Sequence, residues 1–506
     1  MPHRARDRSR SAGGFQRGEN QENSLQRSRP DQIRQGRAGN QEKLTTKRLM
    51  LKMIVSNLLP MAITEDANFQ AFVKALKPTA NIPDKSVMRS ELLTVYEREK
   101  MAVRRSLASA DDVVLTCELR LSRAEYSYLT VGCHVVDKNG KLKSYMLETT
   151  CLLSDQSAGN IINQLSAIME AWGIKEKVHT VVTAGMPQLK KMKANWTHMP
   201  CFAYTLNMVF NDLLMCDDSL REVLTKCQEI VRFFKNDSEA EQKLREIQNQ
   251  QRLQQEELIM YTGEGWLTLL HMLERLDKQY KAMPMVLNER GKTHFILIEN
   301  DKKKIQNTIS ALIPLREATS RMKKEGFDTI SVIIPLLKKL MDNLTEQAKT
   351  RNKVAAMLLS KCEHHFGKDN IPKLAPITAL DPRFKNQLED QNKRQAKAKI
   401  IKELSESAAG SASSALDLEC LLSNYMAHEP LPEGGNPLAW WRFTGSKKFG
   451  EMSKLALKKL GIVSTAVPLD RAFSKADDRF CSLSSSQEPE NINMILFLNS
   501  NWDTKP

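Results

Sequence analysis

Side chains that bind metals are scattered along this chain of 506 residues. Zinc sites use cysteine and histidine at short, paired spacings. The chain has nine cysteines, no two of them in a Cys-x-x-Cys pair, and the short run Cys362-Glu363-His364-His365 has no second half elsewhere. We therefore predict no metal site and no cofactor. The scattered cysteines favour reduced, buried thiols of a cytosolic or nuclear protein over a disulfide framework.

Residues 111–215 combine strand and helix patterns. Runs of β-branched and aromatic residues at 113–117, 126–137 and 143–153, with an Asn-Gly turn at 139–140, predict a strand followed by a hairpin. Apolar residues at helical spacing from 158 to 172 predict a helix that ends at Gly173. The remaining elements predicted are a short buried strand at 180–183 and helices at 189–196 and 201–214. This order matches an RNase-H-like core.

Most of the remaining chain has helical periodicity. Pro60 and Pro78 bound short amphipathic stretches before residue 111, and apolar stripes recur from 217 to 344. Residues 405–414 (SESAAGSASS) form a low-complexity segment that predicts a loop. The chain is therefore predicted to be an α+β protein, rich in helix, whose core is interrupted by a helical insertion.

Six motifs follow one another along the chain: YSYLTVGCHVVDKNGKLKSYMLET (126–149), WTHMPCFAYTLNMV (196–209), ITALDPRFK (377–385), NPLAWWR (436–442), VPLDRAFSKA (467–476) and ILFLNSNW (495–502). In this order the sequence resembles the hAT-superfamily DNA transposases, in particular their domesticated relatives of the zinc-finger BED type. The resemblance covers roughly residues 48–501. It implies an RNase-H-like core, a helical insertion and a C-terminal dimerisation region.

The resemblance also implies a two-metal site whose ligands are altered here. Where the family has two aspartates and a glutamate, this chain has Glu118, Ala184 and Asp470, and Tyr204 stands in place of a histidine. A two-metal site needs acidic oxygens to hold both ions and the scissile phosphate. Since alanine offers no oxygen, we expect no enzymatic activity. In an inactive protein, Glu118 and Asp470 are ordinary surface or salt-bridge residues. The alternative is a residual metal-dependent nuclease or transposase that uses these two residues.

Two groups of aromatic residues have alternative interpretations. The resemblance makes Trp266 a candidate for stacking on a DNA base, but its apolar neighbours on a helix equally favour packing in a core. An apolar block near the C-terminus lies in the region that dimerises in the family, and the alternative is a monomeric core. The dimerisation candidates are Trp440, Trp441, Arg471, Phe473, Ile495, Leu496, Phe497 and Leu498.

The charge of the chain favours a polyanionic partner. The formal net charge is +15, which suits nucleic acid or an acidic surface. A basic tail begins with the DNA-binding candidates Arg4, Arg6, Arg8 and Arg10. Three interpretations of this tail stay open: contact with phosphates, a signal for nuclear import, or a solvated segment without a partner. We find no secretory signal and no apolar run long enough to cross a membrane. No Cys-x-x-Cys with a following histidine pair is present, so we expect no BED finger.

The domain organisation that we predict is a disordered basic tail (1–45), an N-terminal helical region (46–110), the first part of the RNase-H-like core (111–215), a helical insertion domain (216–345), a continuation of the core with the low-complexity loop (346–430) and a hAT-type dimerisation region (431–506). We expect an inactive, transposase-like nuclear protein that forms a homodimer, or a heterodimer with related transposase-derived proteins. DNA or chromatin is an expected partner and transcription regulation an expected role. A decaying element without a selected role remains an alternative.

Overall fold

The computed structural model describes residues 46–121, 127–152, 155–191, 194–261, 265–324, 329–367, 370–407, 415–466 and 489–502. The chain divides after Met50 into two units, and of the first unit only residues 46–50 are described, as helix. All that follows concerns the second unit, Leu51–Pro506. The predicted tail at 1–45 lies outside the described residues, and so do these candidates: Arg4, Arg6, Arg8, Arg10, Asp470, Arg471 and Phe473.

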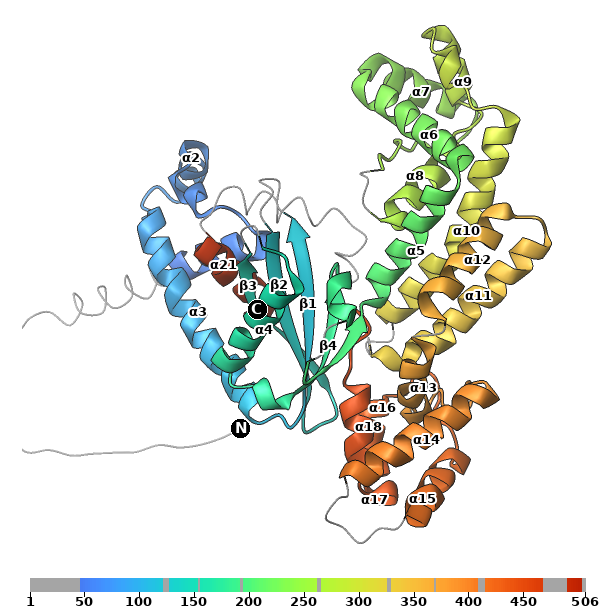
Figure 1. Ribbon diagram of the computed structural model, residues 1–506. Helices are drawn as coiled ribbons and strands as arrows, with labels where there is room; N and C mark the ends of the chain where they lie inside the picture. Colours follow the sequence, from blue (N-terminus) through green and yellow to red (C-terminus); the bar gives the residue numbers. More distant parts are fainter. Residues whose placement is uncertain are drawn as a thin grey trace, which may run out of the picture. The chain divides into compact units, whose positions relative to one another are not determined.

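A five-stranded mixed sheet forms the centre of the core, with the strand order β3-β2-β1-β4-β5 (Figure 1). Its strands are β1 (Val113–Leu121), β2 (Ser127–Val136), β3 (Leu142–Cys151), β4 (Val178–Ala184) and β5 (Thr197–Pro200). The first three strands pair antiparallel, and β4 is parallel to both β1 and β5. The helix α4 (Ala158–Ala171) and the short 3-10 helix η2 (Lys175–Lys177) connect β3 to β4. The predicted order of an RNase-H-like core is confirmed.

The fifth strand was not predicted. We expected a helix at 189–196, but the chain forms the 3-10 helix η3 (Pro187–Lys191) and then β5. A strand of four residues that ends on Pro200 is too short for an alternating pattern. Its pairing with β4, from Thr180 with Thr197 to Thr183 with Pro200, decides its conformation.

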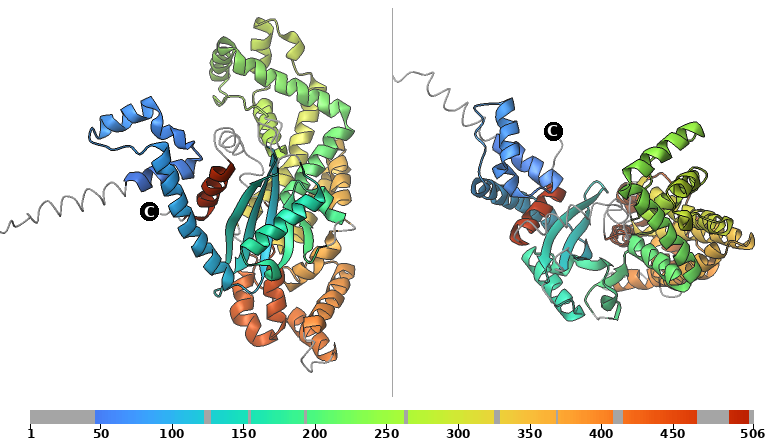
Figure 2. Two further views of the ribbon diagram at one scale, coloured as in Figure 1. Left: turned by 60° about the vertical axis from the view of Figure 1, so that its left-hand side comes forward. Right: turned by 90° about the horizontal axis from the view of Figure 1, so that it is seen from above.

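The free edge of β3 is closed by α21 (Pro489–Asn501), which lies beside β3 and α3 (Figure 2). The Asn501 side chain accepts a hydrogen bond from the Met146 N–H at 3.1 Å and donates one to the Met146 carbonyl at 2.7 Å. Nearer the start of α21, the Asn493 side chain accepts a hydrogen bond from the Thr149 N–H at 2.9 Å. These side-chain amides therefore satisfy backbone groups that an edge strand would otherwise expose.

Residues before the sheet are helical. They form η1 (Met61–Glu65), α2 (Ala67–Leu76) and α3 (Lys85–Ala108). Asp66 caps α2 by accepting from the Phe69 N–H, and Asp84 caps α3 by accepting from the Val87 N–H. The long helix α3 packs against α21 through Tyr96, whose ring meets that of Phe497 edge-on at 5.0 Å.

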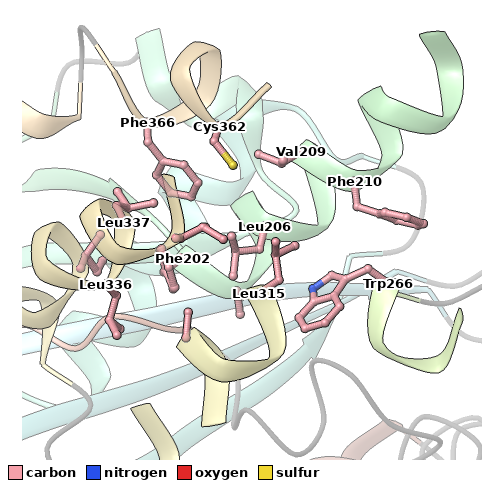
Figure 3. Close-up of a cluster of buried hydrophobic side chains, with 14 of the residues drawn as sticks. Phe202, Leu206, Val209, Phe210, Trp266, Leu315, Leu336, Leu337, Cys362 and Phe366 are labelled. Carbon is pink, nitrogen blue, oxygen red and sulfur yellow. The ribbon is translucent and has the colours of Figure 1, made fainter. Parts of the chain in front are cut away.

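A block of helices follows β5 and begins with α5, which runs directly out of the sheet (Figure 1). Its members are α5 (Phe202–Cys216), α6 (Asp218–Asn236), α7 (Ser238–Gln250), α8 (Trp266–Lys278), α9 (Met283–Glu289), η4 (Thr293–Phe295), α10 (Glu299–Lys324), η5 (Ile330–Val332), α11 (Ile333–Lys349) and α12 (Lys353–Phe366). Phe202, Leu206 and Phe210 of α5 lie in the middle of their apolar core (Figure 3). Because α5 joins sheet and block in one continuous core, the two cannot separate without exposing these side chains.

The stretch 346–430, which we expected to continue the core, contains helices and no strand in its described part. It comprises α12, α13 (Ile371–Leu380), α14 (Asp390–Ser407) and α15 (Ala415–Ala427), and α12 packs on α5 and α11. Residues 405–407 of the predicted loop are the end of α14, and 408–414 lie outside the described residues. Short helices follow: α16 (Pro437–Trp440), a π-helical turn (Trp441–Gly445), α17 (Ser446–Phe449) and α18 (Met452–Leu460). No described helix is both long and apolar enough to cross a bilayer.

A buried polar corner after α13 joins these C-terminal helices together. Asp381 and Arg383 form an ion pair at 2.8 Å, and both side chains are completely buried. The Ser331 hydroxyl also donates to Asp381, at 2.7 Å. Lys385 is 1% exposed and donates to the backbone carbonyls of Tyr425 and His428. All these charged groups have partners, as buried charges must to be tolerated.

Removing one member of the buried pair should be costly. We expect Arg383→Met to lower the free energy of unfolding by about 3–5 kcal/mol, because Asp381 is left as a buried charge without its counterion. The matched control is Lys402→Met, which removes an exposed partner of Glu406 on α14 and should change stability by less than about 0.5 kcal/mol. Urea unfolding of the two variants beside the parent measures both values. Equal changes in the free energy of unfolding for the two variants would show that the buried ion pair stabilises the fold no more than an exposed one.

Candidate functional site

The carboxyl ends of β1 and β4 bring together two of the positions singled out in the sequence. Glu118 and Ala184 are direct partners in the parallel register of the two strands. Partners on neighbouring parallel strands lie about 4.8 Å apart and point to the same face of the sheet. Ala184 is 5% exposed and belongs to the core shared with the helical block. The site thus has one carboxylate on β1 and a methyl group beside it on β4.

Cys201, the residue that precedes α5, lies next to this pair of positions. Its N–H donates to the Thr183 carbonyl at 2.9 Å, and its Sγ accepts from the Ala466 N–H at 3.3 Å. Burial raises the pKa of the Cys201 thiol, and the negative charge of Glu118 raises it further. A thiol in this setting stays protonated, so Cys201 packs as a small apolar side chain and is not a nucleophile.

Tyr204 occupies the same edge, one turn into α5. A side chain added at Gly185, whose φ is +77°, would lie 3.9 Å from Cε2 of the Tyr204 ring. The ring is 36% exposed. The phenol thus stands beside the Ala184–Gly185 turn, where the resemblance expects a histidine.

The segment that precedes Asp470 reaches this edge as well. The Phe202 N–H donates to the Ser464 carbonyl at 2.9 Å, beside the contact of Ala466 with Cys201. Asp470 follows Ala466 by four positions in the sequence and lies outside the described residues. The described residues therefore bring Glu118, Ala184, Cys201 and Tyr204 together.

Sequence reasoning missed a small cavity next to these residues. It measures about 130 Å³ and is lined by Thr183, Gly185, His198, Tyr204, His365 and Lys373 among others. His198 Nε2 lies 2.7 Å from the Thr183 hydroxyl, and His365 Nε2 lies 2.9 Å from Asp212 Oδ2. His198 lies within β5 and belongs to the motif at 196–209, and its place in that motif is the signal that could have found it. His365 comes from α12, and only packing brings it here.

The described residues contain no group of three or more His, Cys, Asp or Glu side chains that could hold a metal ion. The run at 362–365 is divided by its helix: Cys362 is fully buried, whereas His365 faces Asp212. Burial also raises the pKa of the Cys362 thiol, to about 12. Among the described positions where the family has metal ligands, Glu118 supplies the one carboxylate; the adjoining cavity offers a phenol, imidazoles and a lysine, and Asp212 pairs with His365.

Trp266 was a candidate for stacking on a DNA base, and the structure contradicts this. Its indole is 0% exposed, in the first turn of α8 (Figure 3). It lies in the same buried cluster as Phe210 and Leu315. A base could reach the ring only if this core opened, so the alternative of helix packing holds.

The dimerisation candidates that are described are mostly buried in their own chain. Trp441 is 0% exposed and donates from Nε1 to the Leu380 carbonyl at 2.7 Å. Phe497 is also 0% exposed and packs between Tyr96 and Trp172. Their neighbours Ile495, Leu496 and Leu498 are buried, and Trp440 is partly buried. Intramolecular packing thus already uses this apolar area, and the assignment of these residues to a dimer contact stays a prediction.

The fold and the site define a class: an RNase-H-like core, a helical domain that grows out of it and a C-terminal helical region that returns to the sheet. Family models match each part. The ZBED1 RNase-like domain matches residues 116–198, the ZBED1 RNase-like helical domain matches 199–311, and the hAT family C-terminal dimerisation region matches 421–502. The chain is a hAT transposase-derived protein related to the BED zinc finger proteins. The junction of the first two matches assigns α5 to the helical domain.

Curated relatives resemble the chain over much of its length. Zinc finger BED domain-containing protein 4 of Homo sapiens is 24% identical over 510 residues, which cover 90% of this chain and 43% of the relative. Zinc finger BED domain-containing protein 6 of Homo sapiens is 23% identical, over 67% of this chain and 38% of the relative. RICESLEEPER 3 of Oryza sativa subsp. japonica, another BED domain-containing protein, is 22% identical, over 67% and 48%. The chain thus spans less than half the length of these relatives.

Restoring the second acid should make the site responsive to metal. We expect Ala184→Asp to destabilise the protein by about 1–3 kcal/mol without divalent ions, because a second carboxylate is buried beside Glu118. Added Mg²⁺ should recover part of this loss by neutralising the pair. The control is Ala184→Asn, whose side chain has nearly the same shape as aspartate but no charge, so Mg²⁺ should leave its thermal stability unchanged. Thermal unfolding with and without millimolar Mg²⁺ measures this, and equal responses of the two variants would refute it.

Proposed function

We propose that this chain is a catalytically inactive, transposase-derived protein of the nucleus that acts through dimerisation and through association with DNA or chromatin, in the regulation of transcription. The pairing of Ala184 with Glu118 in the β1–β4 register is the observation that carries the first part. The dimerisation match at 421–502 supports the second. The basic charge of the chain supports the third.

The argument for inactivity is one of missing ligands. Two-metal catalysis clamps the attacking and leaving oxygens between two ions, and each ion needs carboxylate oxygens. A methyl group at position 184 supplies none, and it lies against the one carboxylate that remains in the described site. Losing a metal ligand costs several kcal/mol of transition-state stabilisation, which corresponds to orders of magnitude in rate.

Dimerisation needs an exposed apolar surface, which the buried candidates do not offer. Within the matched region Phe443 is 54% exposed, on the π-helical turn that begins with buried Trp441. The buried rings of Trp441, Tyr425 and Phe449 pack together and hold this turn in place. Phe443 is therefore the side chain through which we propose that two copies, or this chain and a related transposase-derived protein, meet.

Association with DNA is supported by charge. Between residues 437 and 460 the chain carries six cations and one acid: Arg442, Lys447, Lys448, Lys454, Lys458 and Lys459 against Glu451. Lys447, Lys448 and Lys454 are exposed. Such a cluster attracts phosphates without reading sequence. The cysteines of the described residues are unpaired with one another, as suits the reducing nucleus, and the relatives carry zinc finger BED names.

Binding without cleavage is the expected behaviour on DNA. The purified protein should retard a duplex, with an affinity that falls steeply between 50 and 200 mM salt because phosphate contacts release counterions, and it should leave the duplex uncut in Mg²⁺ or Mn²⁺. A gel assay measures both, with Glu118→Gln as the control for contaminating nucleases. Metal-dependent nicking that disappears in Glu118→Gln would establish the residual nuclease instead. A flat response to salt would remove DNA from the proposal.

The dimer is tested separately. We expect the parent chain to be dimeric at micromolar concentration in size-exclusion chromatography with light scattering, and Phe443→Asp to weaken the dimer at least tenfold, because a charge enters an apolar contact. The control is Leu416→Asp, which changes another exposed side chain, 75% accessible, just outside the matched region. A monomeric parent chain, or equal behaviour of the two variants, would contradict this part.

A further inference from the structure

A second cavity lies at the opposite end of the β1–β4 pair. It measures about 340 Å³, and its lining includes Asp112, His134, His179, Arg442, Lys454 and Lys458. Its walls come from the first residues of β1 and β4, from β2, and from the π-helical turn and α18 packed over them. On β4 its lining residue His179 precedes Ala184 by five positions, roughly 16 Å at 3.3 Å per residue. It is therefore distinct from the candidate site described above.

A β-bulge turns His179 into this cavity. Val113 pairs with Val178 and Val114 pairs with Thr180, so β4 carries one extra residue, His179, between them. Thr180 is the partner of Val114 and shares its face, so regular alternation from Thr180 would send His179 to the opposite face, yet both Val114 and His179 line the cavity. Bulges of this kind re-aim side chains beside functional sites and weaken the ladder locally.

Two side-chain nitrogens in the lining are buried and have no hydrogen-bond partner among the described residues: Nε2 of His179 and Nε of Arg442. Nδ1 of His179 lies 2.9 Å from the Thr180 hydroxyl, and in the tautomer in which Nδ1 accepts from that hydroxyl, Nε2 carries the ring proton. The other end of the Arg442 guanidinium donates to the Asp137 carbonyl at 3.4 Å. A buried donor without a partner costs about 1–3 kcal/mol. An acceptor that enters the cavity and reaches both nitrogens would offset that cost.

The surrounding charge favours an anion. Lys454 and Lys458 lie one turn apart on α18 and reach the same cavity as Arg442. The opposing carboxylates in the lining are Asp111 and Asp112, and Asp112 pairs with Lys458 at 3.3 Å. Lys454 pairs with Glu451, outside the lining, at 3.0 Å. Burial, together with the positive charges of Lys458 and Lys459, lowers the pKa of His179 to about 3. The imidazole is thus neutral and surrounded by positive charge.

His134 forms part of the wall and does not act as a donor to a ligand. Its Nε2 lies 3.1 Å from the Thr116 hydroxyl and its Nδ1 lies 2.7 Å from the Ser144 hydroxyl. Both nitrogens are therefore used within the sheet, and burial lowers the pKa of this ring to about 4.

We propose that this cavity binds a phosphate group, held by Arg442 and the Nε2–H of His179 and balanced by Lys454. A phosphate offers oxygens in several directions, which suits donors that converge from a strand and from a helix, and its double charge suits a site with more cations than acids. The group is either a free phosphate or pyrophosphate, or the phosphate of a nucleic acid. The proposal does not depend on the dimerisation or the DNA association proposed above.

Calorimetric titration of the full chain with inorganic pyrophosphate, at constant ionic strength, tests the proposal. We expect saturable binding of one pyrophosphate per chain and at least a tenfold weakening in Arg442→Gln, because the guanidinium provides both a donor and a charge. Lys402→Gln, which removes a lysine that is 75% exposed on α14, is the matched control and should bind as the parent does.

A second variant guards against misfolding of Arg442→Gln. Lys454, 79% exposed, lines the cavity but packs little, so Lys454→Gln should keep the thermal midpoint and weaken pyrophosphate by a few fold. Absence of saturable binding in the parent chain, or parental affinity in both cavity variants, would overturn the proposal. Competition separates the sources. Displacement of pyrophosphate by a 5′-phosphorylated oligonucleotide, but not by the same strand without its phosphate, identifies a nucleic acid end, and no displacement by either identifies a free phosphate.

Discussion

The hydrogen bonds between α21 and the free edge of β3 are the interaction on which the rest of this structure depends. They join residues more than 340 positions apart, because Asn493 and Asn501 serve the backbone of Thr149 and Met146. An uncovered edge strand invites pairing with other chains. The return of the C-terminal helix therefore protects the sheet. The same docking buries Phe497 between Tyr96 and Trp172, which is why an apolar segment of the dimerisation region serves as core in a single chain.

The site at the carboxyl ends of β1 and β4 keeps its scaffold without an acid at position 184. The strands β1 and β4 are held by backbone pairing and by the apolar core that they share with α5, and neither needs an acid at position 184. An alanine there also spares Glu118 a like charge at close range, which stabilises the folded state. Catalytic sites are commonly maintained at some expense of stability. Once selection for cleavage is absent, the apolar residue is the more stable choice at this position.

The C-terminal helices combine anchoring with charge. Their attachment to the molecule runs through the buried corner at Asp381, Arg383 and Lys385 and through the hydrogen bond of Trp441 to Leu380. This anchoring holds the cations of the 437–460 segment in fixed positions. In a flexible tail the same cations would not keep a fixed arrangement. Arg442 and Lys454 consequently meet His179 across a cavity, although the three residues come from distant parts of the sequence. A fixed group of cations can select a phosphate, whereas a mobile one attracts polyanions generally.

The sequence by itself determined the strands β1 to β4, the helix α4, the helical character of the remaining chain and the loss of an acid at Ala184. These follow from local periodicity, turn residues and motifs, which act over a few positions. It did not reveal β5, whose four residues carry too short a pattern. Only the tertiary structure decided that Trp266, Trp441 and Phe497 are core residues. An apolar residue in a sequence does not show whether it packs against its own chain or against a partner. The bulge that exposes His179 to Arg442 is likewise a product of strand register, which depends on pairing between distant segments and not on the residues of either strand alone.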